Sequence, residues 1–157
     1  MAVITASGTH VYIGAAVTDA CDTTGEFAAA TPYVEIGLLE TVGEYGDSSA
    51  VVNFAVIGDG RVRKAKGARD AGELTLTSAH DPLDTGQLAM IAAEATKNSY
   101  AFKVVIPDRS VPANVDSIHY FRGKVNSKRL NVGTNDNVVR RMFTVLVDSQ
   151  IYEIPGT

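Results

Sequence analysis

The residues that could do chemistry are few and scattered along this chain of 157 residues. The three histidines, His10, His80 and His119, lie far from one another and from the single cysteine, Cys21. No pair among them has the two- to four-residue spacing of a zinc site. One cysteine also excludes an internal disulfide, and its acidic neighbours should raise the pKa of its thiol instead of activating it. We therefore expect no metal site and no cysteine nucleophile.

The carboxylates do not form a catalytic pattern either. Glu35 and Glu40 are five residues apart on an expected strand, so they point to opposite faces and cannot act as a paired acid and base. The chain has no Gly-x-Ser-x-Gly motif for a serine nucleophile. The sequence thus predicts that the protein is not an enzyme and needs no cofactor. A small hydrolase that uses Asp or Glu residues is the weakest alternative.

The strongest local feature is a cluster of cations, and residues 58–72, which carry it, are predicted to form a protruding loop. Five cations could bind phosphate, but the aromatic side chains that would stack on bases are absent. Residues 1–60 contain eight acids and no Lys or Arg, so a basic loop could dock on the acidic surface of another copy. A solvated loop on a domain that mixes its charges is the other interpretation. The cluster consists of Arg61, Arg63, Lys64, Lys66 and Arg69, followed by Asp70.

The composition indicates which elements position these residues. Valine, isoleucine and threonine together number 42, whereas leucine occurs only 8 times. β-Branched side chains pack well on a pleated sheet, so the chain should be mainly β. No apolar run approaches the ~18 residues of a membrane span, and the N-terminus lacks the pattern of a signal peptide. We expect one domain over residues 1–157, made of strands near residues 9–13, 34–41, 51–57, 73–77, 100–106, 118–125 and 138–147.

One helix is predicted between the strands. Asp81 is a good N-cap and Pro82 suits the first helical position. An apolar stripe of Leu88, Ile91, Ala92 and Ala95 should lie on the sheet. Residues 15–32 are small, polar and acidic and are predicted to form a long loop. The order of elements fits an antiparallel β-sandwich or barrel with one flanking α-helix.

The strand at residues 73–77 alternates cleanly between two faces. Leu74 and Leu76 should face the core, and Glu73, Thr75 and Thr77 should form a polar face. This polar face must meet water, either outside the domain or inside a pore.

The central segment of the chain resembles that of tailed-phage tail tube proteins, the major tail proteins that gene-transfer-agent tails also contain. The residues that carry the resemblance are GRVR at 60–63 and KGARDAGELTL at 66–76, a basic segment and a Gly-x-x-Asp-x-Gly turn leading into an alternating strand. The following helix and the late pair of strands, 118–125 and 139–147, match the family in order. Residues 15–32 match nothing in it.

The resemblance implies a structural virion protein that is made in the host cytoplasm and resides in the phage tail. Six subunits would close into a ring, and rings would stack into a hollow tube for the tape measure protein and then for DNA during ejection. It implies as partners further copies of the chain, the tape measure protein, and the tail terminator and distal tail proteins, and no membrane. The basic loop would contact the next ring, Glu40, Glu44 and Asp47 would lie at a subunit contact, and Glu73, Thr75 and Thr77 would face the lumen. The alternative is a monomeric β-sandwich binding module of the carbohydrate-binding type, although the chain has no Trp.

Overall fold

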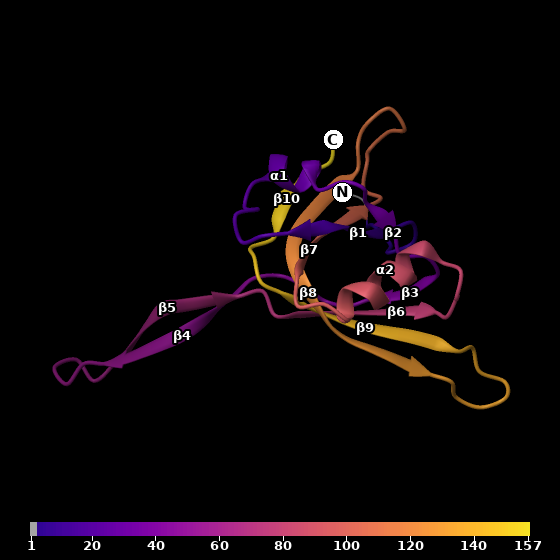
Figure 1. Cartoon of the computed structure of the whole chain (residues 1–157). Helices are drawn as coiled ribbons and strands as arrows, with labels where there is room; N and C mark the ends of the chain where they lie inside the picture. The colour runs from indigo at the N-terminus through magenta and orange to yellow at the C-terminus, as the bar shows by residue number, and fades with distance from the viewer. Residues whose placement is uncertain (1–2) are drawn as a thin grey trace.

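The computed structural model describes residues 3–157, which fold around one curved antiparallel sheet (Figure 1). The strands of the sheet follow one another in the order β2-β1-β7-β8-β9-β6-β3, and β10 pairs with one end of β8. The mainly β, antiparallel fold predicted from the composition is confirmed. The strands of the sheet are β1 (His10–Val17), β2 (Val34–Glu35), β3 (Leu39–Val42), β6 (Glu73–Ala79), β7 (Ser99–Ile106), β8 (Ser117–Asn131), β9 (Arg140–Val147) and β10 (Tyr152–Ile154).

The predicted alternation on β6 is confirmed and shows where the core lies. Leu74 and Leu76 are fully buried, whereas Glu73 and Thr75 are exposed. On the paired strand β9, Phe143 and Val145 are buried beside them. Val139, which falls in the strand predicted over residues 138–147, precedes β9 and is only half-buried. The concave face of the sheet therefore holds the main apolar core.

Strand β8 joins two layers of the sandwich. Its residues 117–123 pair with β7, and its residues 123–131 pair with β9. The change of partner falls at Gly123, where a Cβ atom would lie 2.7 Å from Val145 Cγ1 and 2.9 Å from the Leu146 carbonyl oxygen. A bulge between Val125 and Ser127 follows at once and increases the local bend. One layer is thus β2-β1-β7 with the first half of β8, and the other is the second half of β8 with β9, β6 and β3.

The predicted helix exists as α2 (Thr85–Glu94), but its start and its buried face were predicted wrongly. Asp84, not Asp81, is the N-cap, because the Asp81 side chain accepts a hydrogen bond from the Leu83 amide and forms a turn instead. Leu88 is 48% exposed. The helix buries Gly86, Gln87, Met90 and Ala93 instead. This face approaches the sheet so closely that a Cβ on Gly86 would lie 1.9 Å from the Glu35 carbonyl oxygen.

A second helix, α1 (Thr24–Ala29), lies within residues 15–32, which we expected to be a loop. Thr23 and Glu26 form a reciprocal capping box that starts it. Strand β1 also continues to Val17, three residues into the expected loop. Helix α1 covers the outer face of the sheet, where Phe27 is buried with Tyr120 in a small second core.

The single strand predicted over residues 34–41 is divided into β2 and β3. Leu38 between them has a φ of 56°, a left-handed conformation that a strand cannot contain. The break lets β2 pair with β1 and β3 pair with β6. Neither helix in the described part of the chain combines the length and the apolar character needed to cross a bilayer.

Candidate assembly surfaces

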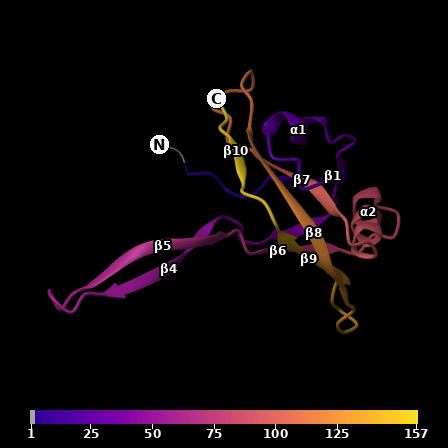
Figure 2. The same ribbon diagram turned by 60° about the vertical axis from the view of Figure 1, so that its left-hand side comes forward.

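A long β-hairpin leaves the body of the protein between β3 and β6. It consists of β4 (Ser48–Ala55) and β5 (Val62–Asp70), which pair with each other and with no other strand of residues 3–157. Figures 1 and 2 show it extending far from the sheet. Nine strand residues span roughly 30 Å. We call residues 48–70 the arm. Most of segment 58–72, which we predicted to be a loop, is strand β5. The segment is extended because it pairs with β4, the alternating strand that precedes it in the chain.

The arm exposes apolar side chains that would normally be buried. Val51 and Phe54 are 64% and 66% exposed, and Ile57 at the tip is fully exposed. Val51 and Phe54 lie on opposite faces of the hairpin, since they are three positions apart along β4. Val52, which is 49% exposed, lies on the same face as Phe54, and adjoining exposed apolar side chains of this kind indicate an interaction site.

All five predicted cations lie on the arm or at its turn. Arg63 forms an ion pair with Asp59 at 3.0 Å, and Arg69 forms one with Asp47 at 3.1 Å. The Arg61 amide and the Arg63 guanidinium both donate to Asp59, which holds the pKa of that carboxyl below its usual value. Within residues 3–157, the remaining cations Arg61, Lys64 and Lys66 have no carboxylate within 4.0 Å.

Of the other predicted contact residues, Glu40 lies on β3, whereas Glu44 and Asp47 lie between β3 and the arm. Two of the three have partners within the chain. Asp47 is paired with Arg69, as above. Glu40 accepts hydrogen bonds from the Arg140 guanidinium, which lower the pKa of the carboxyl. Glu44 is exposed. Asp70, predicted at the ring contact, accepts a hydrogen bond from the Gly72 amide at 2.9 Å and closes the turn into β6.

The polar face of β6 continues across its neighbours. Thr75 lies opposite Thr144 of β9, and Thr77 lies opposite Met142. Arg129 of β8 is in turn opposite Met142. Directly paired residues point to the same face of a sheet. The residues predicted to face the lumen, Glu73, Thr75 and Thr77, therefore belong to one polar convex surface formed by β8, β9, β6 and β3.

Both borders of this four-stranded layer are unpaired in the structure of residues 3–157. Strand β3 is the last strand of the sheet. On the other side, residues 124–131 of β8 extend past the end of β7 and pair only with β9. Each border presents backbone N–H and C=O groups that can pair with another strand.

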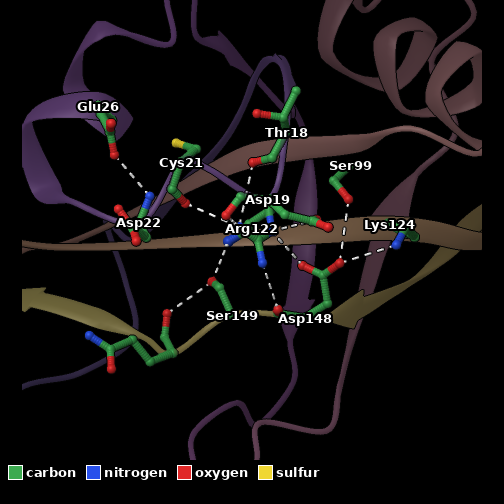
Figure 3. Close-up of polar contacts among 11 residues, drawn as sticks. Thr18, Asp19, Cys21, Asp22, Glu26, Ser99, Arg122, Lys124, Asp148 and Ser149 are labelled. Carbon is green, nitrogen blue, oxygen red and sulfur yellow. Dashed lines mark hydrogen bonds and ion pairs between the residues drawn. The ribbon is translucent and has the colours of Figure 1, made fainter.

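A buried arginine fixes the outer loops to the sheet (Figure 3). Arg122 lies on β8 and is only 9% exposed. Its guanidinium donates to the Asp148 carboxylate at 2.8 Å and the Asp148 carbonyl at 3.0 Å. It also donates to the carbonyls of Asp19 and Cys21 at 3.0 and 3.2 Å. No sequence motif signals this role, which depends on three segments far apart in the chain.

Of the groups first considered for chemistry, His10 and Glu35 form an exposed ion pair. No cluster of three or more His, Cys, Asp or Glu side chains able to hold a metal is found in residues 3–157. Cys21 is buried, and this burial is the main cause that raises the pKa of its thiol. The negative charge of Glu26 raises the pKa further. His119 is half-buried and shares a 2.7 Å hydrogen bond with the Tyr45 hydroxyl.

A protruding arm with exposed apolar side chains and a sheet with open edges are features that suit contacts with other chains. Comparison with protein-family models gave a match to the phage tail tube protein family over residues 9–150. The chain therefore belongs to the phage tail tube protein family, which places it in the virion tail as a structural subunit of the tube. Comparison with curated proteins gave no significant match.

Solved structures with the same fold include three components of tail-like tubes. The SPP1 tail tube has a TM-score of 0.69 at 14% identity, with 98% of this chain and 80% of that chain covered. The sheath/tube terminator of an extracellular contractile injection system gives 0.69 at 12% identity, with 98% of each chain covered. The tube-terminating cap of the anti-feeding prophage gives 0.70 at 12%, with 99% and 93% covered. The monomeric binding module is not favoured.

Proposed function

We propose that this tail tube protein closes into hexameric rings, which stack into a hollow conduit for DNA ejection. The observation that carries the proposal is the pair of unpaired borders on the four-stranded layer, β3 on one side and residues 124–131 of β8 on the other. Copies joined at these borders would form a closed barrel, which removes the free edges.

The strand directions suit such a closure. All pairs in the layer β8-β9-β6-β3 are antiparallel, and four strands are an even number. The strand β3 of one copy therefore runs opposite to the strand β8 of the next copy, and the antiparallel pattern continues across the joint. A head-to-tail contact that repeats and closes generates a ring.

The convex polar surface is our candidate for the wall of the lumen. It contains Glu73, Thr75 and Thr77, and hydroxyl groups contribute no charge. Two of its cations are neutralised within the chain, Lys124 by Asp148 at 3.2 Å and Arg140 by Glu40. A wall with few free cations suits a conduit, because every cation–phosphate contact would retard the passing DNA.

The arm is our candidate for the contact between stacked rings. An isolated two-stranded hairpin is only marginally stable in water, and its exposed apolar residues need a partner. We propose that Arg61, Arg63, Lys64, Lys66 and Arg69, with Asp70 at the base, face the neighbouring ring, and that Glu40, Glu44 and Asp47 lie near a subunit joint.

The remaining expectations complete the proposal. The tape measure protein would occupy the tube before DNA, and tail terminator and distal tail proteins would close its two ends. The terminator and cap among the structural neighbours support the idea that the ends of such tubes carry proteins of this fold. We also propose that the protein has no catalytic activity and is made in the host cytoplasm.

Negative-stain electron microscopy of the concentrated, purified protein tests the proposal. We expect hollow tubes or rings with six-fold symmetry. A protein that remains a single particle at every concentration, with no ring in virion-like particles, would contradict it.

A further inference from the structure

Most cations on β8 and β9 have a carboxylate partner in their own chain. Arg129 and Arg141 have none within residues 3–157, and Arg141 also has a buried Nε atom without a hydrogen-bond partner. Of the two, Arg129 is exposed. The paired cations are Arg122 with Asp148 at 2.8 Å, Lys124 with Asp148 at 3.2 Å, Lys128 with Glu94 at 3.5 Å, and Arg140 with Glu40.

Arg129 lies at one border of the four-stranded layer. It belongs to the part of β8 that pairs only with β9. Its register partner Met142 is itself paired with Thr77, so the Arg129 side chain lies on the convex polar surface. A guanidinium on an unpaired border is within reach of whatever strand joins that border.

Glu44 lies at the opposite border. The Gly43 amide donates to the Thr75 carbonyl at 2.9 Å, which extends the contact of β3 with β6 by one residue beyond Val42. Glu44 follows directly, is exposed, and takes part in no ion pair of the described residues. Its neighbours Glu40 and Asp47 both have arginine partners, so Glu44 is the acid of this border that lacks one.

We propose that Arg129 of one copy and Glu44 of the next form an ion pair across the subunit joint. This inference rests on the ring closure proposed above and assigns the charged contact at that joint. The occupant of the β8 border is a second copy, because the opposite border of the same layer supplies both the complementary backbone edge and the complementary charge. Barrel closure staggers neighbouring strands along the axis, so the two residues need not lie at the same level within one subunit.

Charge reversal tests the pair. We expect R129E and E44R each to raise the protein concentration needed for tube assembly, at low salt, by roughly tenfold, equivalent to about 1.4 kcal/mol per subunit. The double variant R129E/E44R should assemble at close to the wild-type concentration, because it restores the pair in the opposite sense. Salt should reduce the penalty of each single variant, since exposed charges are screened.

The control combines E44R with K97E, a reversal of an exposed cation beyond the end of α2. This variant has the same net charge as R129E/E44R but should not recover assembly. Thermal unfolding of each unassembled variant separates folding from association, and all should melt close to the wild type because both side chains are exposed.

The outcomes distinguish the pair from the ring itself. A wild-type protein that forms no rings or tubes would refute the ring proposal and the pair together. Wild-type tubes with a double variant no better than its worse parent would refute the pair alone. Single variants that assemble as the wild type does would also overturn it, as would equal recovery by the control.

Discussion

Replacing Arg122 with methionine should destabilise the isolated subunit by about 3 kcal/mol. Methionine keeps the apolar stem but removes every donor of the guanidinium. Three of the lost hydrogen bonds are 3.0 Å or shorter, and one of them joins two charged groups. A hydrogen bond to a charged group contributes about 1.5–3 kcal/mol, and a neutral one about 1 kcal/mol. Lys124 still pairs with Asp148 in the variant and limits the loss.

The loss of stability should be visible in both urea and thermal unfolding. For a chain of this size, about 3 kcal/mol corresponds to a decrease in Tm of about 6–12 °C. The control is Arg109→Met, which removes an exposed arginine with a 3.9 Å ion pair to Asp116. This control should change the free energy of unfolding by no more than about 1 kcal/mol.

The same variant should alter the dependence of stability on pH. Burial acts to raise the pKa of Asp148, but hydrogen bonds from Arg122 and Lys124 outweigh it and lower the pKa below its ordinary value of 3.8. A lowered folded pKa adds stability that is present above pH 3.8 and is lost as the pH falls through the folded value. Arg122→Met should therefore lose less stability between neutral and acidic pH than the wild type. A variant with wild-type stability and a wild-type pH profile would refute the proposed role of Arg122.

Three further predictions concern the arm and the bend of β8. Reversing Arg61, Arg63 and Lys64 to glutamate should shorten the tubes, as measured by electron microscopy, without lowering the Tm of the subunit; tubes of wild-type length would reject the arm as the ring contact. Amide hydrogens of residues 48–70 should exchange rapidly in the free subunit and become protected in the tube, as followed by mass spectrometry; equal exchange in both states would show that the arm makes no contact. Gly123→Ala should destabilise the subunit by about 2 kcal/mol in urea, because overpacking costs about 1–3 kcal/mol and the new Cβ would meet Val145 at 2.7 Å; a neutral effect would show that the two strands can separate there.

The strands could be predicted because their signal is local. The alternation of Leu74 and Leu76 with polar neighbours is enough to place β6 and its two faces. The cation cluster likewise predicted that the segment containing β5 leaves the body of the protein. Its strand character was missed, since the expected loop began at residue 58 and β4 was considered apart from it.

The helices show what local patterns cannot decide. Helix α2 has two faces that could pack on the sheet. The face that contains Gly86 and Met90 is buried, because glycine at position 86 permits the closest approach of the helix to the sheet. A prediction by hydrophobicity alone selects Leu88 instead. The short helix α1 did have a local signal, the capping box of Thr23 and Glu26, which could have identified it.

The burial of Arg122 has no local signal. Its acceptors are carbonyls near residue 20 and the carboxylate and carbonyl of Asp148, which only the folded chain brings together. The free borders of β3 and β8 are also a property of the sheet order. They require the pairing of all the strands to be known.

A cryo-electron microscopy map of the assembled tube tests the central claim most directly. The account predicts that β3 of each subunit lies beside residues 124–131 of β8 in the next, in one continuous antiparallel barrel, with the arm against the adjacent ring. A tube in which both borders face solvent and the subunits meet through other surfaces would contradict it.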